Sequence, residues 1–458
     1  MNTYDKDEIL YIDRSRVWHH LVQHRPFENS DPLVIVEGKG MKVTDIKGKE
    51  YLDAVSGGVW TVNVGYGREE IARAVYEQLT KMCYFANSAG SIPGALFAEK
   101  LIEKMPGMER VYYSNSGSEA NEKAYKMVRQ LAHLNNDGEK HKIIFRDRDY
   151  HGTTIATLSS SGQSERKAQY GPLAPGFVEF PHCCCYRCPF GKQYGSCNIE
   201  CAHALEDTIL KEGSDTVGAV VLEPVTAGGG IIPPVPEYFP IIQSICKKYD
   251  VLLHIDEVVC GMGRTGKWFG YQHFEVQPDI VTMAKGVASG YAAISCTVTT
   301  GALFEEFKGD PADRMRYFRD ISTFGGCTAG PAAALENTRI IEEENLLDNA
   351  HDMGEYLKEL LHGLKDKHQM VGDVRGKGLL AGMELVKDRE SRQPVEESVV
   401  MRIAADCMAQ GVIIGRTNRS FRDFNNTIAL SPALIATRSD LDEIVTAVDT
   451  AIGNLVKA

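Results

Sequence analysis

Runs of apolar residues without polar alternation mark the centre of the chain. Val251–Ile255 is one such run, and Pro278–Ala284 contains a second. An unbroken apolar run is typical of a strand buried on both faces of a parallel sheet. Further strands are predicted at residues 111–113, 142–145 and 217–222, and helices at residues 119–134 and 238–249. Because strand and helix alternate, we expect an α/β fold with a mostly parallel sheet and helices on both of its faces.

The two ends of the chain follow a different pattern. Short strand signals at residues 33–36 and 41–45 are joined by glycines and predict a small antiparallel meander outside the main sheet. After residue 330, further elements are predicted as helices at 332–343, 347–364 and 440–456, and as strands at 378–386 and 412–415. With 458 residues, the chain is long enough for two domains. We expect a large domain at residues 61–330 and a smaller α+β domain built from residues 1–60 and 331–458.

Composition excludes two classes of partner. The formal net charge is -12, which argues against nucleic acid or an anionic membrane as a general partner. Residues 1–20 lack the apolar core of a secretory signal, and no apolar run approaches the length of a membrane span. We therefore expect a cytoplasmic protein that binds neither nucleic acid nor membrane.

A carboxylate and an amine stand at the ends of the two central strands. Asp256 follows the first apolar run, and Lys285 follows the second and precedes Gly286. Open α/β sheets bind their ligands at the carboxyl ends of the strands. Pyridoxal 5′-phosphate needs a lysine to form a Schiff base with its aldehyde and a carboxylate to keep its pyridine nitrogen protonated. A solvated lysine and a helix-capping aspartate are the alternative, which the pair taken alone does not exclude.

Two further segments could bind a phosphate. Ser116, Gly117 and Ser118 stand at the start of the helix predicted at 119–134, where free backbone N–H groups and the helix dipole attract anions. Ordinary capping of that helix by a serine is the alternative. Thr323, in the sequence Thr-Phe-Gly-Gly, could bring a hydroxyl to a phosphate or belong to an interdomain turn.

Three other side chains are candidates for the walls of a site. Tyr150 follows the strand at 142–145 and could stack on a planar ring, or it could be structural. Glu223 follows the strand at 217–222 and could bond to a ring or substrate, or form a salt bridge. Trp60 ends a glycine-rich connection and is either a core anchor or a pocket wall.

Two motifs suggest other chemistry. Gly261–Gly266 fits the G-x-G-x-x-G pattern of dinucleotide-binding proteins, but no helix-forming run follows it and no acidic residue ends a second strand at the required distance. The thiols of a cysteine-rich insertion have the spacing of a four-thiolate metal site, namely Cys185, Cys188, Cys197 and Cys201. This insertion lies away from the predicted cofactor residues, so we favour reduced thiols that stabilise a loop and predict no bound metal.

Five short motifs in a fixed order resemble those of the class III pyridoxal-phosphate aminotransferases, the ω-amino acid:pyruvate group, over nearly the whole chain. They stand at residues 116–120 (Ser-Gly-Ser-Glu-Ala), 150–152 (Tyr-His-Gly), 256–258 (Asp-Glu-Val), 263–266 (Gly-Arg-Thr-Gly) and 284–286 (Ala-Lys-Gly). The resemblance implies fold type I, with a mostly parallel, seven-stranded-type sheet in the large domain. It also implies a homodimer, or a dimer of dimers, with active sites at the interface.

The resemblance gives each matching residue a role. Lys285 forms the Schiff base, and Asp256 pairs with the pyridine nitrogen. Val258 and Tyr150 pack on opposite faces of the ring. Gly117 and Ser118 hold the phosphate, and Thr323 reaches the phosphate of the partner subunit. Ser116 and Glu223 are predicted as further cofactor contacts from their positions in the sequence. After the Gly-Gly pair that follows Thr323, Cys327 stands where many relatives have His or Asn, so this segment departs from the family pattern.

The family's carboxylate-binding arginine has two candidates. It precedes a Ser-Pro-Pro-Leu-like segment, here residues 431–434. Counting forward from residues 411–414 selects Arg416, and counting back from the segment selects Arg422. We prefer Arg416, because the residues before it fit a strand better. Trp60 and Tyr150 would then wall the substrate pocket.

The resemblance implies transfer of an amino group from an ω-amino acid or aminosulfonate to pyruvate, giving L-alanine. Taurine, which would give sulfoacetaldehyde, is the donor that it favours, on the cysteine-rich insertion and the loop at residues 416–426. Arginine pairs with either carboxylate or sulfonate oxygens. β-Alanine or another ω-amine therefore stays open as the donor, and a same-fold aminomutase or decarboxylase is a more distant alternative.

Overall fold

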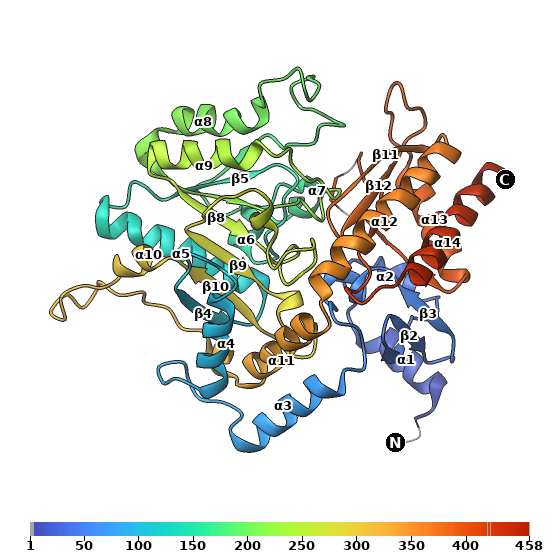
Figure 1. Ribbon diagram of the computed structural model, residues 1–458, viewed down its shortest axis with the longest axis horizontal. Helices are drawn as coiled ribbons and strands as arrows, with labels where there is room; N and C mark the ends of the chain where they lie inside the picture. The colour runs from blue at the N-terminus through green and yellow to red at the C-terminus, as the bar shows by residue number, and fades with distance from the viewer. Residues whose placement is uncertain (1–3, 419, 422, 458) are drawn as a thin grey trace.

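The computed structural model describes residues 4–418, 420–421 and 423–457. Three β-sheets organise these residues (Figure 1): one large sheet, and two smaller ones that lie together beside it with both chain termini. No helix in the described part of the chain is long and apolar enough to cross a membrane.

The large sheet has seven strands in the order β4-β10-β9-β8-β7-β5-β6. Within the described chain β10 alone runs antiparallel to its neighbours, so the predicted mostly parallel sheet is confirmed. All six residues of β7 are buried, as an apolar run covered on both faces requires. The bounds are β4 Arg110–Ser114, β5 Lys142–Arg146, β6 Phe177–Phe180, β7 Val217–Leu222, β8 Leu252–Asp256, β9 Ile280–Met283 and β10 Ser295–Thr299.

Strands β6 and β10 are absent from the sequence prediction. The sequence of β10, Ser-Cys-Thr-Val-Thr, has no apolar run, yet all five residues are buried. Thr297 is tolerated there because its hydroxyl donates to the backbone oxygen of Ala120, 2.9 Å away. A buried strand of short polar residues, one of which bonds to a neighbouring helix, cannot be recognised from hydrophobicity.

Helices cover both faces of this sheet. Ile143 and Val221 pack with α5 on one face, whereas Ile144 and Val220 belong to the core on the other face, which also contains Phe239 of α9. Alternate residues of a strand point to opposite faces, which explains the division. The helices of this part are α3 Glu69–Lys81, α4 Ile92–Ile102, α5 Gly117–Asn135, α6 Ile155–Ser159, α7 Ser164–Lys167, α8 Glu200–Glu212, α9 Tyr238–Tyr249, α10 Gly301–Glu305 and α11 Ala329–Glu343.

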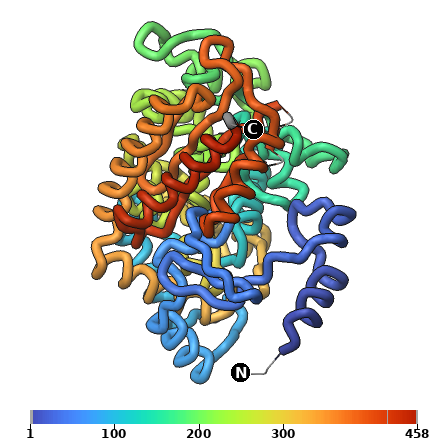
Figure 2. Tube along the Cα trace, turned by 90° about the vertical axis from the view of Figure 1, so that its right-hand side faces the viewer, coloured from blue at the N-terminus to red at the C-terminus, as the bar shows by residue number. Residues whose placement is uncertain are grey.

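Both chain ends build the smaller sheets. β13 from the C-terminal part pairs in parallel with β3 and so completes the N-terminal meander, and Figure 2 shows the C-terminal helices beside that meander. The domain boundaries near residues 60 and 330 stay a prediction. The strands are β1 Ile35–Lys39, β2 Lys42–Asp45, β3 Glu50–Asp53 and β13 Val412–Ile413 in one sheet, and β11 Val371–Gly376, β12 Ala381–Leu385, β15 Thr427–Leu430 and β14 Gly415–Arg416 in the other. The helices are α1 Lys6–Arg16, α2 His24–Phe27, α12 Leu346–Lys367, α13 Glu397–Ala409 and α14 Arg438–Lys457.

Arg264 connects segments from the beginning, middle and end of the chain. It lies in the glycine motif that resembles a dinucleotide fingerprint. Its guanidinium is fully buried and donates to four acceptors from distant segments: the backbone oxygens of Leu379 and Pro432, and the side chains of Ser56 and Asn63. Burial lowers the pKa of Arg264 to about 10. The motif therefore has a structural use that is unrelated to nucleotides.

We expect Arg264→Ala to lower the free energy of unfolding by about 3 kcal/mol, because buried acceptors lose charged donors and a cavity remains. Denaturant midpoints followed by circular dichroism would measure the change. The control is Arg339→Ala, which removes an exposed pair with Glu336 and Glu343 and should change stability by no more than about 0.5 kcal/mol after solvent screening. Equal effects of the two substitutions would contradict this account of Arg264.

Candidate active site

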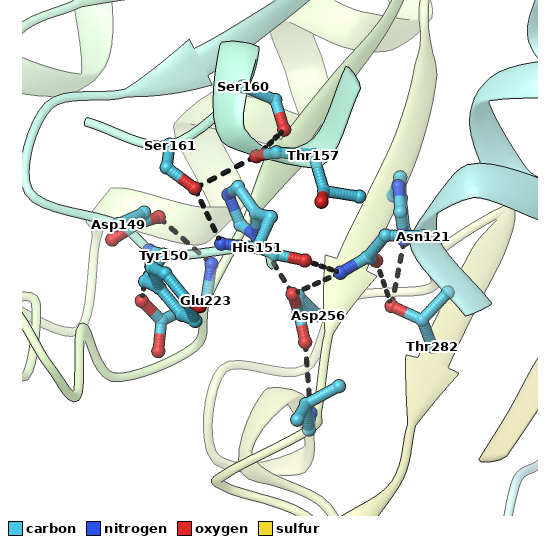
Figure 3. Close-up of polar contacts among 12 residues, drawn as sticks. Asn121, Asp149, Tyr150, His151, Thr157, Ser160, Ser161, Glu223, Asp256 and Thr282 are labelled. Carbon is cyan, nitrogen blue, oxygen red and sulfur yellow. Dashed lines mark hydrogen bonds and ion pairs between the residues drawn. The ribbon is translucent and has the colours of Figure 1, made fainter. Parts of the chain in front are cut away.

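Asp256 is the last residue of β8 and is buried with three hydrogen-bond donors around it. Its Oδ2 accepts from Nδ1 of His151 and from Nδ2 of Asn121, each at 2.8 Å, and its Oδ1 accepts from the backbone N–H of Val258 at 3.0 Å (Figure 3). Burial by itself would raise the pKa of Asp256, but the hydrogen bond and charge of His151, with the other two donors, outweigh it and lower the pKa. The carboxylate is therefore held ionised.

Lys285 lies in the turn after β9, the strand next to β8, with φ +44. Its side chain is half-buried, and its Nζ lies 5.8 Å from the centroid of the Trp60 ring. Burial lowers the pKa of Lys285, while the negative charges of Asp256 and Glu223 act against that shift. A lysine with a lowered pKa is a better base and nucleophile near neutral pH.

Tyr150 and Glu223 come together from neighbouring strand ends. The backbone N–H of Tyr150 donates to Oε1 of Glu223 at 2.9 Å, and that of Ala227 donates to Oε2 at 3.0 Å. Burial, followed by the negative charges of Asp149 and Asp256, raises the pKa of Glu223. Glu223 forms no ion pair with a described residue, so the salt bridge left open by the sequence is not found. The guanidinium of Arg166 lies 5.2 Å from the centroid of the Tyr150 ring.

The start of α5 faces these residues. Ser116 caps the helix by accepting from the backbone N–H of Glu119 at 3.2 Å, which is the capping alternative considered for it. A Cβ added to Gly117 would lie 3.0 Å from the methyl groups of Val258, so the helix start and the end of β8 are in close contact. The hydroxyl of Ser118 accepts from the backbone N–H of Thr153 at 3.0 Å.

Three further residues that the sequence predicts for the site lie in separate parts of the fold. Thr323 is exposed, in a turn whose Gly325 packs on β4, and makes no hydrogen bond with a described site residue. Arg416 lies on β14 and donates to Glu397 at 2.8 Å. Arg422 lies outside the described residues. Trp60 packs against the small core cluster around Cys260, as the core anchor considered for it would, and its ring also borders Lys285. Its role as a pocket wall stays a prediction.

Sequence reasoning assigned no role to three buried neighbours of Asp256, namely His151, Asn121 and Thr282. His151 was visible only as part of the motif at 150–152. Asn121 falls in a predicted helix, where a polar residue is usually exposed. Thr282 is the cross-strand partner of Asp256 in β9, and the order of the two strands would have placed it there.

The cysteine-rich insertion surrounds a cavity of about 20 Å³ that Cys185, Cys188, Cys197 and Cys201 line with other residues. All twelve cysteines have free thiols. Among the residues that the structure describes, no group of three or more His, Cys, Asp or Glu side chains is arranged to hold a metal ion.

A comparison with protein families matches residues 25–452 to the model described as "Aminotransferase class-III". The chain belongs to the class III aminotransferases. This confirms the resemblance carried by the five motifs, and with it the expected α/β aminotransferase fold and enzyme class. Enzymes of this family use pyridoxal 5′-phosphate.

Similar proteins fall within the same family. The chain is 62% identical over 453 residues, 99% of its length and 98% of the relative's, to a hypotaurine/taurine–pyruvate aminotransferase of Paracoccus denitrificans. It is 62% identical over 449 residues, 98% of each chain, to a taurine–pyruvate aminotransferase of Bilophila wadsworthia. Among solved structures, an ω-transaminase from Pseudomonas jessenii in complex with PMP superposes with a TM-score of 0.92 at 32% identity, covering 98% of each chain.

The residues present fit the coenzyme of this family. A carboxylate has about four acceptor positions, and the described residues use three of those on Asp256, which leaves one for a protonated ring nitrogen. The amine of Lys285 makes no hydrogen bond or ion pair within the described chain, which leaves it available to an aldehyde. The two groups that pyridoxal 5′-phosphate needs are therefore both available, at the ends of adjacent strands.

Proposed function

We propose that this chain transfers the amino group of taurine to pyruvate, giving sulfoacetaldehyde and L-alanine. The observation that carries the proposal is the 62% identity, over 98–99% of the chain, to the two aminotransferases whose names give taurine as donor and pyruvate as acceptor. The free lysine and the ionised aspartate at adjacent strand ends support the same reaction class.

Pyridoxal 5′-phosphate, when bound, supplies an aldehyde that condenses with amines and a cationic ring that withdraws electrons from the amine-bearing carbon. In this proposal Lys285 attaches it and Asp256 accepts a hydrogen bond from its ring nitrogen. Val258 and Tyr150 flank the ring. Its phosphate would be held by the backbone N–H groups at the start of α5, at Ser116, Gly117 and Ser118. Glu223 fixes the backbone of Tyr150.

The Nζ of Lys285 is the base of the proposed reaction. It takes a proton from the amine-bearing carbon of the donor and, in the second half with pyruvate, returns a proton to the carbon that becomes the α-carbon of alanine. Burial lowers the pKa of this amine, so a larger fraction is neutral and able to accept a proton. The apolar side of Trp60 helps to keep water from the amine.

Arg416 is the proposed contact for the acid group of the donor, with Trp60 and Tyr150 as walls of the pocket. Its guanidinium is held by Oε1 of Glu397 at 2.8 Å and by Asn418 at 3.2 Å. An incoming sulfonate or carboxylate would have to compete with Glu397 for this cation. A substitution of Glu397 can therefore test the assignment of Arg416 as the acid contact.

We expect Arg416→Ala to raise KM for taurine about tenfold, because a charged hydrogen bond to the donor is lost, and Glu397→Gln to lower KM, because the competing anion is gone. Steady-state kinetics with varied taurine would measure both. If Arg422→Ala raises KM while changes at 416 and 397 leave it unaltered, the acid contact is Arg422 and the Arg416 assignment is wrong.

We also propose that two copies of the chain form the active unit, with Thr323 of each reaching the phosphate of the other. Two large apolar side chains close to Thr323 in the sequence support this proposal. Ile321 is 79% exposed and Phe324 is 66% exposed, and large apolar side chains gathered at one place on a surface usually mark a contact with another protein. Thr323 itself makes no hydrogen bond with the described site residues of its own chain.

The experiment that tests the donor uses purified enzyme loaded with pyridoxal 5′-phosphate and supplied with pyruvate. With taurine, alanine and sulfoacetaldehyde should form in equal amounts, and omission of pyruvate should stop turnover after one equivalent of taurine. β-Alanine and hypotaurine are compared under the same conditions. Formation of alanine from β-alanine, with none from taurine, would reject taurine as the donor and keep the reaction class.

A further inference from the structure

Asn121 links the side chain of Asp256 to two other buried groups. One of its N–H groups donates to Oδ2 of Asp256 at 2.8 Å, and the other donates to the backbone oxygen of His151 at 2.7 Å. Its Oδ1 accepts from the hydroxyl of Thr282 at 2.7 Å (Figure 3). Asn121, Thr282 and Asp256 are all buried, so water cannot replace any of these partners.

The hydrogen bonds of this group run in one direction. The hydroxyl of Thr282 has a single hydrogen, which it gives to Asn121, so it must accept from Nε2 of His254, 3.0 Å away. His254 is buried and burial lowers its pKa to about 3, so the ring is neutral and carries its hydrogen on Nε2. Donation therefore passes from His254 to Thr282, to Asn121 and finally to Asp256.

This direction fixes the orientation of the Asn121 amide. If the amide were turned over, its oxygen would face both the carboxylate of Asp256 and the backbone oxygen of His151. One acceptor would then face two other acceptors in a buried site without water, which is costly. The hydroxyl of Thr282 selects the orientation in which both N–H groups point towards Asp256 and His151.

His151 provides the second side-chain donor. An ionised carboxylate only accepts, so Nδ1 of His151 carries a hydrogen towards Oδ2 of Asp256. The backbone of His151 is fixed on both sides, because its N–H donates to the hydroxyl of Ser161 at 3.0 Å and its oxygen accepts from Asn121. Nε2 of the ring has no hydrogen-bond partner among the described residues, so the ring is held through Nδ1.

We propose that Asn121, oriented by Thr282 and His254, and His151 are positioning residues that hold Asp256 ionised and reserve one acceptor position of its Oδ1 for the ring nitrogen of the coenzyme. The inference rests on the proposed function and deepens it. Oδ2 already accepts twice and Oδ1 accepts once, from Val258, so the remaining position belongs to Oδ1.

The test is Thr282→Val, which removes the hydroxyl and keeps the shape of the side chain. Apoenzyme is titrated with pyridoxal 5′-phosphate and with its 1-deaza analogue, in which carbon replaces the ring nitrogen, and binding is followed by protein fluorescence. We expect Kd for pyridoxal 5′-phosphate to rise about tenfold, the effect of losing most of one charged hydrogen bond. Kd for the analogue should change less than about twofold, because the analogue has no ring nitrogen to pair with Asp256.

Thr297→Val is the matched control. Thr297 is an equally buried threonine of the same sheet, but its hydroxyl bonds only to the backbone oxygen of Ala120. Neither Kd should change with this variant. His151→Phe, which keeps an aromatic ring without the donor, provides a second route if Thr282→Val does not fold, and should weaken binding of pyridoxal 5′-phosphate about tenfold to a hundredfold.

Two other outcomes would overturn the inference. Equal weakening of both ligands would mean that the group supports the fold and not the ring nitrogen, and unchanged binding of both would mean that Asp256 does not depend on it. If wild-type protein binds pyridoxal 5′-phosphate no better than the analogue, and gives no near-visible absorbance band, the proposed function itself is wrong.

Discussion

Replacing Lys285 with alanine is expected to lower kcat for transfer from taurine to pyruvate by about 10⁴-fold while the fold stays intact. The substitution removes both the amine that attaches the coenzyme and the base that moves the proton. Lys285 has φ +44, a conformation that costs alanine about as much as lysine, so backbone strain is unchanged. Alanine formation and circular dichroism would measure the two parts of this expectation.

Chemical rescue separates the role of Lys285 in proton transfer from damage to the site. Added methylamine should restore part of the activity of Lys285→Ala, because a small free amine can occupy the space left by the side chain and accept the proton. Borohydride treatment should add the mass of the coenzyme to wild-type protein at residue 285 and add nothing to the variant. The control is Lys267→Ala, which changes an exposed lysine bonded only to a backbone oxygen. Full activity in Lys285→Ala would reject the proposed mechanism.

The centre of the site could be predicted from the sequence because strand ends are easy to find. Unbroken apolar runs located β8 and β9, and the residues that follow such runs lie at the carboxyl edge of a parallel sheet. Predicting that Asp256 and Lys285 belong to one site therefore required only the assumption that the two strands are neighbours, which the structure confirms. The ends of the two predicted runs differ from the ends of β8 and β9 by only one or two residues.

The partners of Asp256 could not be predicted in the same way. Asn121 and His151 lie 135 and 105 residues away from it in the sequence, and no periodicity reports which helix packs over which strand end. A buried asparagine also looks like an exposed one in the sequence, since its burial depends on donors and acceptors that only the fold brings together. The same limit applies to Arg416, whose partner Glu397 starts a separate helix, and to β10, where the hydroxyl of Thr297 bonds to α5.

Asp256→Asn is expected to lower kcat about a thousandfold, although it changes the volume of the side chain very little. The donors of His151 and Asn121 would draw the amide oxygen to the position of Oδ2. The NH₂ group would then lie at the position of Oδ1, facing the backbone N–H of Val258 and the ring nitrogen of the coenzyme. A donor there favours the unprotonated ring nitrogen, and an uncharged ring withdraws electrons poorly.

The pH dependence of kcat should differ between wild type and Asp256→Asn in a definite direction. The folded-state pKa of Asp256 lies below its ordinary value of 3.8, so the charge of this group, and the stability that its hydrogen bonds contribute, are fully present above pH 3.8 and are lost as pH falls through the lower folded-state pKa. Wild-type kcat should therefore show no titration of Asp256 in the neutral range. In Asp256→Asn, acid should partly restore kcat, because only the solvent can then protonate the ring nitrogen. Asp250→Asn, at a carboxylate that is 97% exposed, is the control with wild-type behaviour, and a pH profile of Asp256→Asn parallel to wild type would show that residue 256 does not set the charge of the ring.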